Sequence, residues 1–154
     1  QILFHVLDEG ISRLLTEAER VAAENPNPRD RLERLLFAHI NGFETKRSQV
    51  TVFLLERQSA LGVSREQYLT KRRRYDQIFV RTVAEGQRQG VFRDGDPTVM
   101  TFGILGMYNW MIQWFDPDGR LTPEDIHSTF FSMVMAGIGS SVARSAARRR
   151  SSGR

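Results

Sequence analysis

The segment that most constrains this chain is GILGMYNWMIQWFDPDGRLTPEDI, residues 103–126. It predicts a helix over about residues 97–115 that is apolar on every side and carries two tryptophans four residues apart. Such a helix must be covered all round, by its own domain, by a membrane or by a second copy of the chain. The apolar stretch, residues 99–115, is shorter than the ~20 residues that a bilayer span needs. It also contains Asn109 and Gln113, so we exclude a membrane span. The helix is then buried within its own domain or against a second copy of the chain.

A helical period of 3.6 residues runs through the rest of the chain, and no segment has the alternation of a strand. Capping signals mark the ends: Asn27 before Pro28 starts one helix, and Thr122 before Pro123 starts the last. Gly90 is expected to end a long helix in the left-handed conformation. The predicted helices cover about residues 2–24, 28–46, 49–60, 65–89, 97–115 and 123–143. We therefore expect an all-α fold, an antiparallel bundle of about six helices.

Composition matters here for what it excludes. The chain has no cysteine, which excludes disulfides, thiol catalysis and zinc–thiolate sites. The formal net charge is +4, but five arginines follow Asp125, the last acidic residue, and without them the net charge is −1. The basicity therefore belongs to the chain's end. We expect residues 1–143 to form one domain and residues 144–154 to be a disordered tail, with a nucleic-acid-binding arm as the alternative.

The helices predicted over residues 97–115 and 123–143 each carry two apolar stripes, whereas a small domain has one core. Leaving ten such side chains in water would forgo ~1.5–3 kcal/mol for each. A two-fold dimer in which this helix pair meets its copy as a four-helix bundle covers both stripes. The expected interface residues are Met100, Ile104, Met107, Met111, Phe115, Ile126, Phe130, Phe131, Val134, Gly137 and Ile138. The alternative is that both helices are central in a monomer.

Motifs of catalysis and metal binding do not occur in the sequence. The three histidines, His5, His39 and His127, are far apart and lack metal-ligand spacing. There is no G-x-S-x-G motif and no glycine-rich phosphate loop. We therefore expect no catalytic residue, no metal and no cofactor.

Polar residues that interrupt apolar stripes are the better candidates for a binding site. His39 does so, and is either a satisfied core histidine or a ligand contact. Asn109 and Gln113 lie among tryptophans, and a buried amide must find a hydrogen bond or lose ~1–3 kcal/mol. These amides either line a pocket for an apolar ligand with one polar group or hold a contact within the bundle. The basic run at residues 71–74 is either solvated or placed at the mouth of such a pocket.

Three segments resemble parts of one known family, the tetracycline-repressor family of bacterial transcription regulators. ILFHVLDEGISRLL, residues 2–15, resembles the helix that follows the helix-turn-helix in that family. EGQRQGVFRDGDP, residues 85–97, and GMYNWMIQWFDPDGRLTPEDI, residues 106–126, resemble the region of its last two helices. The spacing N-W-x-x-x-W-F followed by P-x-G-x-L-T-P-E-D-I looks most like the branch that includes repressors of fatty-acid and sterol breakdown.

The resemblance implies a cytoplasmic, homodimeric transcriptional repressor whose ligand-binding and dimerisation domain is this chain. The family's helix-turn-helix, which supplies its DNA contacts, is absent from the chain, so operator DNA would be bound only through that missing domain. The family places its ligand, here an apolar molecule such as an acyl-coenzyme A or a lipid-like metabolite, among the helices equivalent to residues 28–46, 49–60, 65–89 and 97–115. The candidate ligand-binding residues are His39, Phe43, Phe53, Tyr75, Phe79, Phe102, Asn109, Trp110 and Trp114.

Two hypotheses from other classes stay open at this point. One is an enzyme that uses a helical cavity, although no constellation of nucleophile, base or metal supports it. The other is a helical dimerisation scaffold without a ligand, which a filled interior would favour over a cavity of ~300 Å³ or more.

Overall fold

The computed structural model describes residues 2–41 and 63–140, and the side chains within residues 8–41 and 66–140. The elements are α1 (Ile2–Glu24), α2 (Pro28–Asn41), α4 (Val63–Arg88), α5 (Pro97–Trp110), the short 3₁₀ turn η1 (Met111–Gln113) and α6 (Pro123–Ile138). The predicted all-α fold is confirmed over these ranges, where the only strand-like pairing is a single bridge between Phe92 and Gly139. The helix predicted for residues 49–60 lies outside the described residues.

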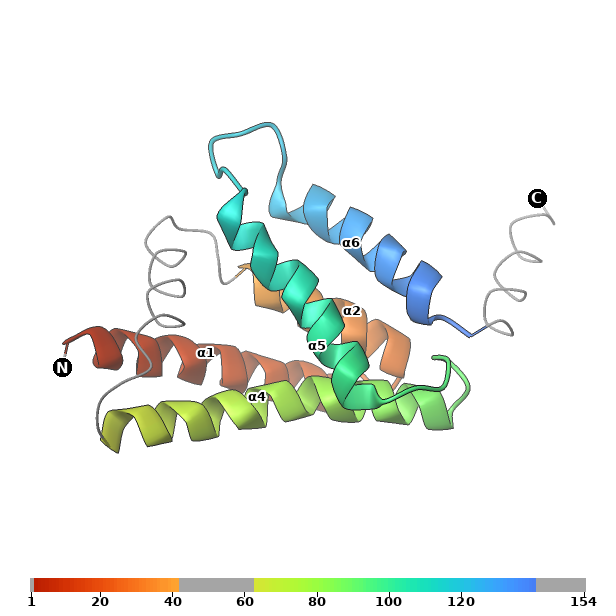
Figure 1. The fold of residues 1–154 in the computed structure, drawn as a ribbon, viewed down its shortest axis with the longest axis horizontal. Coiled ribbons are helices and arrows are strands. Elements are labelled where there is room, and N and C mark those ends of the chain that lie inside the picture. The colour runs from red at the N-terminus through yellow and green to blue at the C-terminus, as the bar shows by residue number, and fades with distance from the viewer. Residues whose placement is uncertain (1, 42–62, 141–154) are drawn as a thin grey trace.

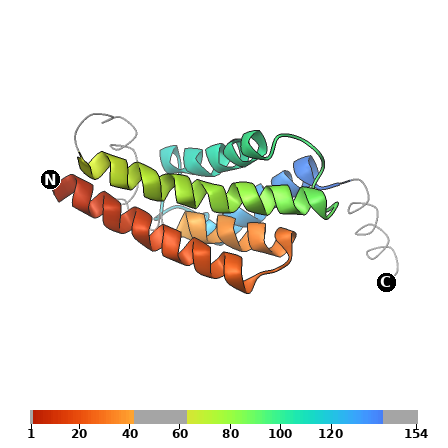
Figure 2. The ribbon, with the colours of Figure 1, turned by 90° about the horizontal axis from the view of Figure 1, so that it is seen from below.

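The helices pack in two groups (Figures 1 and 2). α1 contacts both α2 and α4, and α2 contacts α4, so these three form a three-helix bundle. α1 and α4 run side by side in the same direction, and α2 returns antiparallel to them. α5 packs on α4 and α6 packs on α2, and these last two helices also contact each other. α2 and α4 therefore lie between α1 and the last helix pair.

The predicted caps form at three helix ends. The side chain of Asn27 accepts hydrogen bonds from the backbone N–H of Arg29 at 2.9 Å and of Asp30 at 3.2 Å. Thr122 and Asp125 form a reciprocal capping box at the start of α6. Gly90 has φ of 69°, the left-handed conformation expected after α4.

The apolar helix ends earlier than predicted. Regular α-helix stops at Trp110, and the chain tightens into η1 for its last three helical residues. The fold therefore places a change of helical geometry directly after the first tryptophan.

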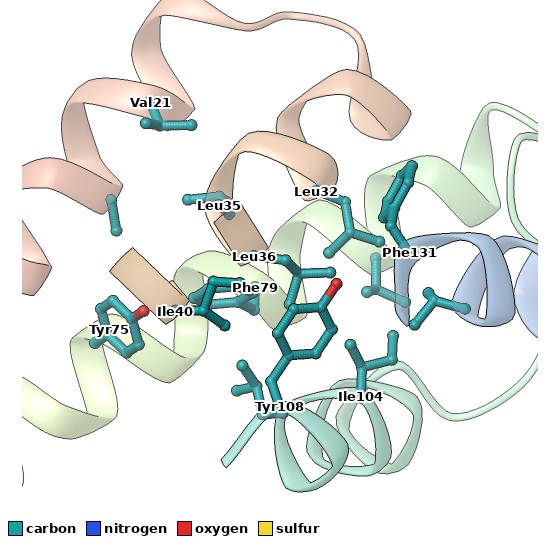
Figure 3. Close-up of a cluster of buried hydrophobic side chains, with 14 of the residues drawn as sticks. Val21, Leu32, Leu35, Leu36, Ile40, Tyr75, Phe79, Ile104, Tyr108 and Phe131 are labelled. Atoms are coloured by element: carbon teal, nitrogen blue, oxygen red, sulfur yellow. The ribbon is translucent and has the colours of Figure 1, made fainter. Parts of the chain in front are cut away.

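The core is continuous from α1 to α6, and Figure 3 shows its centre. α2 contributes Leu32, Leu36 and Ile40, which are fully buried. Opposite them, Tyr108 reaches from α5 toward Leu36 and is itself fully buried. The other buried apolar residues are Ile11, Leu15, Ala18, Val21, Leu35, Tyr75, Phe79, Val83, Phe92, Ile104, Leu105, Met111, Phe115, Ile126, Phe131, Val134 and Ile138.

A short clasp ties the end of α6 to the loop after α4. The backbone N–H of Arg93 donates to the carbonyl of Ile138 at 2.8 Å, and that of Ser140 donates to the carbonyl of Val91 at 3.1 Å. The Phe92 ring, at the centre of the clasp, lies against Gly86 of α4 and is almost fully buried. α6 is thus fixed to the end of α4 although α5 separates the two in the sequence.

Within the described ranges, each helix is too short or too polar to cross a membrane.

Candidate functional site

A buried histidine at the meeting point of α2, α4 and α5 is the centre of the candidate site. His39 of α2 is 5% exposed. Its Nδ1 lies 2.8 Å from the hydroxyl of Tyr75 on α4, and its Nε2 lies 2.8 Å from Oδ1 of Asn109 on α5. Because an amide oxygen can only accept, Nε2 carries the hydrogen and Nδ1 accepts the Tyr75 hydroxyl hydrogen. Both ring nitrogens of a neutral imidazole are therefore engaged. We call His39, Tyr75 and Asn109 the His39 cluster.

Burial keeps this polar cluster uncharged. Removal from water lowers the pKa of His39 to about 4, the hydrogen bond to Asn109 acts in the opposite direction, and the nearby Arg72 lowers it further. Burial likewise raises the pKa of the Tyr75 hydroxyl far above its ordinary value. At neutral pH the cluster thus consists of uncharged hydrogen-bonding groups.

The surroundings of this cluster are aromatic and aliphatic. Phe79 meets Tyr75 edge-on, with ring centroids 5.2 Å apart, and its ring centroid lies 6.3 Å from that of His39. Ile40 of α2 is fully buried and belongs to the same core cluster as Tyr75 and Phe79 (Figure 3). Neutral donors and acceptors inside an apolar wall suit the recognition of a largely apolar molecule that carries one polar group.

The basic run on α4 is already engaged with carboxylates. Nζ of Lys71 lies 2.6 Å from both carboxylate oxygens of Asp8 on α1, and Arg74 donates to Glu19 on α1 at 2.7 Å. Arg72 pairs with a carboxylate one turn further along its own helix. These three cations therefore act mainly in holding α4 to α1 and in local pairing.

A second buried histidine, which is hydrogen-bonded to a tyrosine, was not predicted from the sequence. Nδ1 of His127 on α6 lies 3.2 Å from the hydroxyl of Tyr108 on α5. His127 is 8% exposed, and burial lowers its pKa while the charge of Glu33 acts against that shift. One feature of the sequence indicated it: His127 lies four residues before Phe131, on an apolar stripe of the last helix.

The comparison with known families decides the class of this domain. A family model described as "Tetracyclin repressor-like, C-terminal domain" matches residues 25–138, most of the chain. The chain belongs to this family.

Relatives of this tetracycline-repressor-like domain include named regulators. It is 25% identical over 114 residues to the transcriptional repressor KstR2 of Mycobacterium tuberculosis, covering 73% of this chain and 57% of that repressor. The chain therefore spans little more than half the length of this relative.

Two solved structures extend the comparison. PfmR, a regulator of the same family from Thermus thermophilus, matches with a TM-score of 0.78 and 28% identity, over 88% of this chain and 74% of PfmR. AibR in complex with isovaleryl coenzyme A and operator DNA matches with a TM-score of 0.73 and 29% identity, over 86% of this chain and 72% of AibR.

The tetracycline-repressor-like domain brings together four of the nine predicted ligand residues: His39, Tyr75, Phe79 and Asn109. Three others, Phe102, Trp110 and Trp114, are 50%, 65% and 44% exposed and lie on the outer side of α5 and the turn after it. Phe43 and Phe53 lie outside the described residues. Gln113 is exposed, whereas Asn109 is half-buried.

The predicted interface residues of this domain lie largely inside the protomer. Seven of them are buried in its own core: Ile104, Met111, Phe115, Ile126, Phe131, Val134 and Ile138. Met100, Met107 and Phe130 are half-buried against that core, and Gly137 is exposed. The large apolar side chains that remain exposed within the described ranges are Val99, Phe102, Trp110, Trp114 and Met133. We call these five residues the outer apolar face.

A groove of about 690 Å³ lies between α1 and α2 and reaches His127. Several of its carboxylates are already matched by arginines of the same helices. Arg20 pairs with Glu17 at 2.6 Å and also with Glu24, and Arg29 lies 3.4 Å from Glu33. The lining of this groove contains none of the three members of the His39 cluster, so the two are separate features of the domain.

Proposed function

We propose that this chain is the effector-binding and dimerisation domain of a tetracycline-repressor-like transcription regulator, and that the effector binds against the His39 cluster. The observation that carries the proposal is a buried, uncharged polar cluster at the meeting point of three helices. The structure of AibR with both isovaleryl coenzyme A and operator DNA, a chain with a similar domain, supports it.

The chemistry of the cluster suggests the class of ligand. An apolar chain would pack on Phe79 and Ile40, each buried methylene contributing ~0.8 kcal/mol. A single uncharged acceptor, such as a thioester carbonyl, would take a hydrogen bond from the Tyr75 hydroxyl or from Nε2 of His39. A charged group would stay outside, because burial of an unpaired charge is costly. Short-chain acyl-coenzyme A thioesters fit this description.

The DNA-binding step belongs to a part of the regulator that this chain does not show. We propose that ligand binding changes the affinity of the whole regulator for its operator, in the cytoplasm where that DNA lies. Ligand can do so only if its affinity differs between the DNA-binding and the released state.

The partner that we propose for the outer apolar face is a second copy of the chain. Large exposed apolar patches mark interaction surfaces, and a two-fold axis would pair this face with itself. Gly103 and Gly106 of α5 and Gly137 of α6 are exposed, and a Cβ added to any of them would meet nothing within 4 Å in the protomer. Open backbone beside exposed tryptophans allows two helix pairs to approach closely.

Isothermal titration calorimetry with a panel of acyl-coenzyme A thioesters, the matching free acids and free coenzyme A tests the ligand. We expect saturable binding of one thioester class and none of free coenzyme A. Asn109→Ala should strengthen that binding about tenfold, because a ligand acceptor then takes the Nε2 hydrogen of His39 without displacing a bonded partner. In the free variant that buried N–H is unpaired at a cost of ~1–3 kcal/mol, which the ligand relieves. The matched control is Gln113→Ala, which removes an exposed amide four residues further on and should leave affinity unchanged.

No heat of binding across the whole panel would contradict the effector role and favour the scaffold hypothesis. Equal affinities of the Asn109→Ala and Gln113→Ala variants would place the ligand away from His39.

A further inference from the structure

Three consecutive residues at the end of α5 face three different neighbours. Tyr108 bonds to His127 on α6, Asn109 bonds to His39 on α2, and Trp110 is 65% exposed on the outer apolar face. Successive residues of an α-helix are turned by about 100° relative to one another, which is what separates these directions. One helical turn thus touches the candidate ligand site, the last helix and the proposed interface at once.

The backbone of this turn links the three side chains. The backbone N–H of Met111 bonds to the carbonyls of both Asn109 and Tyr108, and the 3₁₀ turn η1 begins there. A 3₁₀ turn is a frequent ending of an α-helix, and its hydrogen-bond geometry is poorer than that of the α-helix before it. A change in the backbone of this turn would move the three side chains before it together, because they are attached to the same short stretch of backbone.

The two hydrogen bonds on this turn are unequal. The bond between His39 and Asn109 is 2.8 Å long, whereas the bond between Tyr108 and His127 is 3.2 Å long. The longer bond is the weaker of the two. If the turn shifts to satisfy Asn109, the contact of Tyr108 with His127 is therefore the one that yields first.

Asn109 is half-buried, so the loss of its hydrogen-bond donor inside the protein still carries a cost. A ligand that takes the Nε2 hydrogen of His39 leaves the Asn109 oxygen without that donor, and Asn109 must turn to find another. We propose that the last turn of α5 couples the ligand site to α6 and to the outer apolar face through Tyr108, Asn109 and Trp110. The proposal rests on the proposed function for its ligand, but the coupling itself is a property of the protein alone.

Coupling of this kind is reciprocal, so it can be tested without any ligand. The chain has three histidines, and ¹⁵N labelling of histidine gives ring-nitrogen signals that can be assigned to each. His39→Leu removes the donor to Asn109. We expect it to shift the ring-nitrogen signals of His127, on another helix, and the tryptophan fluorescence emission, which Trp110 and Trp114 share.

Two control variants separate coupling from general disturbance. His39→Gln has nearly the volume of the leucine variant but restores a donor for Asn109, so His127 should return toward its wild-type signals. Thr82→Val removes a buried hydroxyl of α4 that donates to the carbonyl of Ile78 on its own helix. It should leave His127 and Trp110 unchanged.

A second variant covers the case in which His39→Leu does not fold. Tyr108→Phe removes only the hydroxyl that bonds to His127, and we expect it to shift the ring-nitrogen signals of His39. The proposal is overturned if His127 is unmoved by His39→Leu in a folded chain, if leucine and glutamine variants behave alike, or if Tyr108→Phe leaves His39 unchanged. None of these outcomes would affect the calorimetric test of ligand binding, because that test depends only on the measured heats of binding.

Discussion

At the scale of single residues, His39 shows how one side chain satisfies two interpretations of the same sequence position. It interrupts an apolar stripe, and the structure shows a core histidine with both ring nitrogens bonded. The same bonds make it the polar centre of an otherwise apolar interior. Its role in ligand binding stays a prediction, but its neutral state follows from burial and has a measurable consequence.

The free energy of unfolding should fall in mild acid because of His39. Its pKa is about 4 in the folded chain, against an ordinary value of 6.5, so below pH 6.5 the unfolded state binds the proton more readily. The contribution of His39 to stability is therefore complete above pH 6.5 and is lost as the pH falls toward 4. The full loss is about 3 kcal/mol, at ~1.4 kcal/mol for each unit of pKa difference. Urea unfolding at a series of pH values between 7 and 4 measures it.

His39→Leu provides the control for that measurement. It should be less stable than the wild type at neutral pH. It should nevertheless lose less stability between pH 6.5 and 4, because it lacks the His39 imidazole while its carboxylates titrate as in the wild type. Parallel curves for the two proteins would show that His39 does not resist protonation in the folded state.

At the scale of elements, three helix ends with clear capping residues could be predicted from the sequence. The end of the apolar helix was wrong, as was that of the last helix, which ends at Ile138 and not near residue 143, and the rotation of the helices could not be predicted. Asn27, Thr122 and Gly90 act locally, and each forms the cap that was expected. The helix over residues 97–115 is apolar all round, so its period gives no direction for the core. The structure turns Met111 inward and Trp110 outward, which divides the predicted interface and ligand residues differently from the expectation.

Hydrogen bonds between residues far apart in the chain also could not be predicted from the sequence. His39 and Asn109 are 70 positions apart, and their contact depends on how three helices cross. What could be predicted was the need for a partner, because a histidine and an amide on apolar faces must each be satisfied. Tyr108 and His127 were not paired beforehand, since a tyrosine in an apolar helix gives no sign of what its hydroxyl meets.

The clasp between α4 and α6 depends on the absence of a side chain at Gly86. A Cβ built there would lie 2.2 Å from the Phe92 ring, which is buried and has no room to retreat. Gly86→Ala should therefore lower the free energy of unfolding by about 1–3 kcal/mol, the usual cost of overpacking. Gly10→Ala, in α1 where an added Cβ meets nothing within 4 Å, should instead stabilise the chain by up to ~1 kcal/mol. Thermal or urea unfolding measures the change in the free energy of unfolding for both variants. A change of the same sign in both would contradict this packing.

At the scale of the whole molecule, the protomer leaves one side of the α5–α6 pair uncovered. The core of the protomer already covers the inner sides of both helices, whereas the outer apolar face presents two tryptophans and Met133. One side of this apolar helix thus packs against the core of its own chain. We propose that its other side packs against a second copy of the chain.

The dimer has a direct test in the mass of the particle. Light scattering after size exclusion at micromolar concentration should give twice 17.7 kDa for the wild type. Trp110→Lys places a charge on the outer apolar face and should return the mass to 17.7 kDa. Thr16→Lys, which adds the same charge to an exposed position of α1, should leave the dimer intact. A wild-type mass of one chain would exclude the dimer.

The most direct test of ligand recognition at the His39 cluster follows the histidine ring nitrogens during titration with short-chain acyl-coenzyme A thioesters. We expect the signals of His39 to shift saturably, with a midpoint that agrees with calorimetry, and the signals of His127 to follow the same curve. Ligand binding detected by calorimetry with both histidines unchanged would contradict recognition at this cluster, because the ligand would then occupy another part of the molecule.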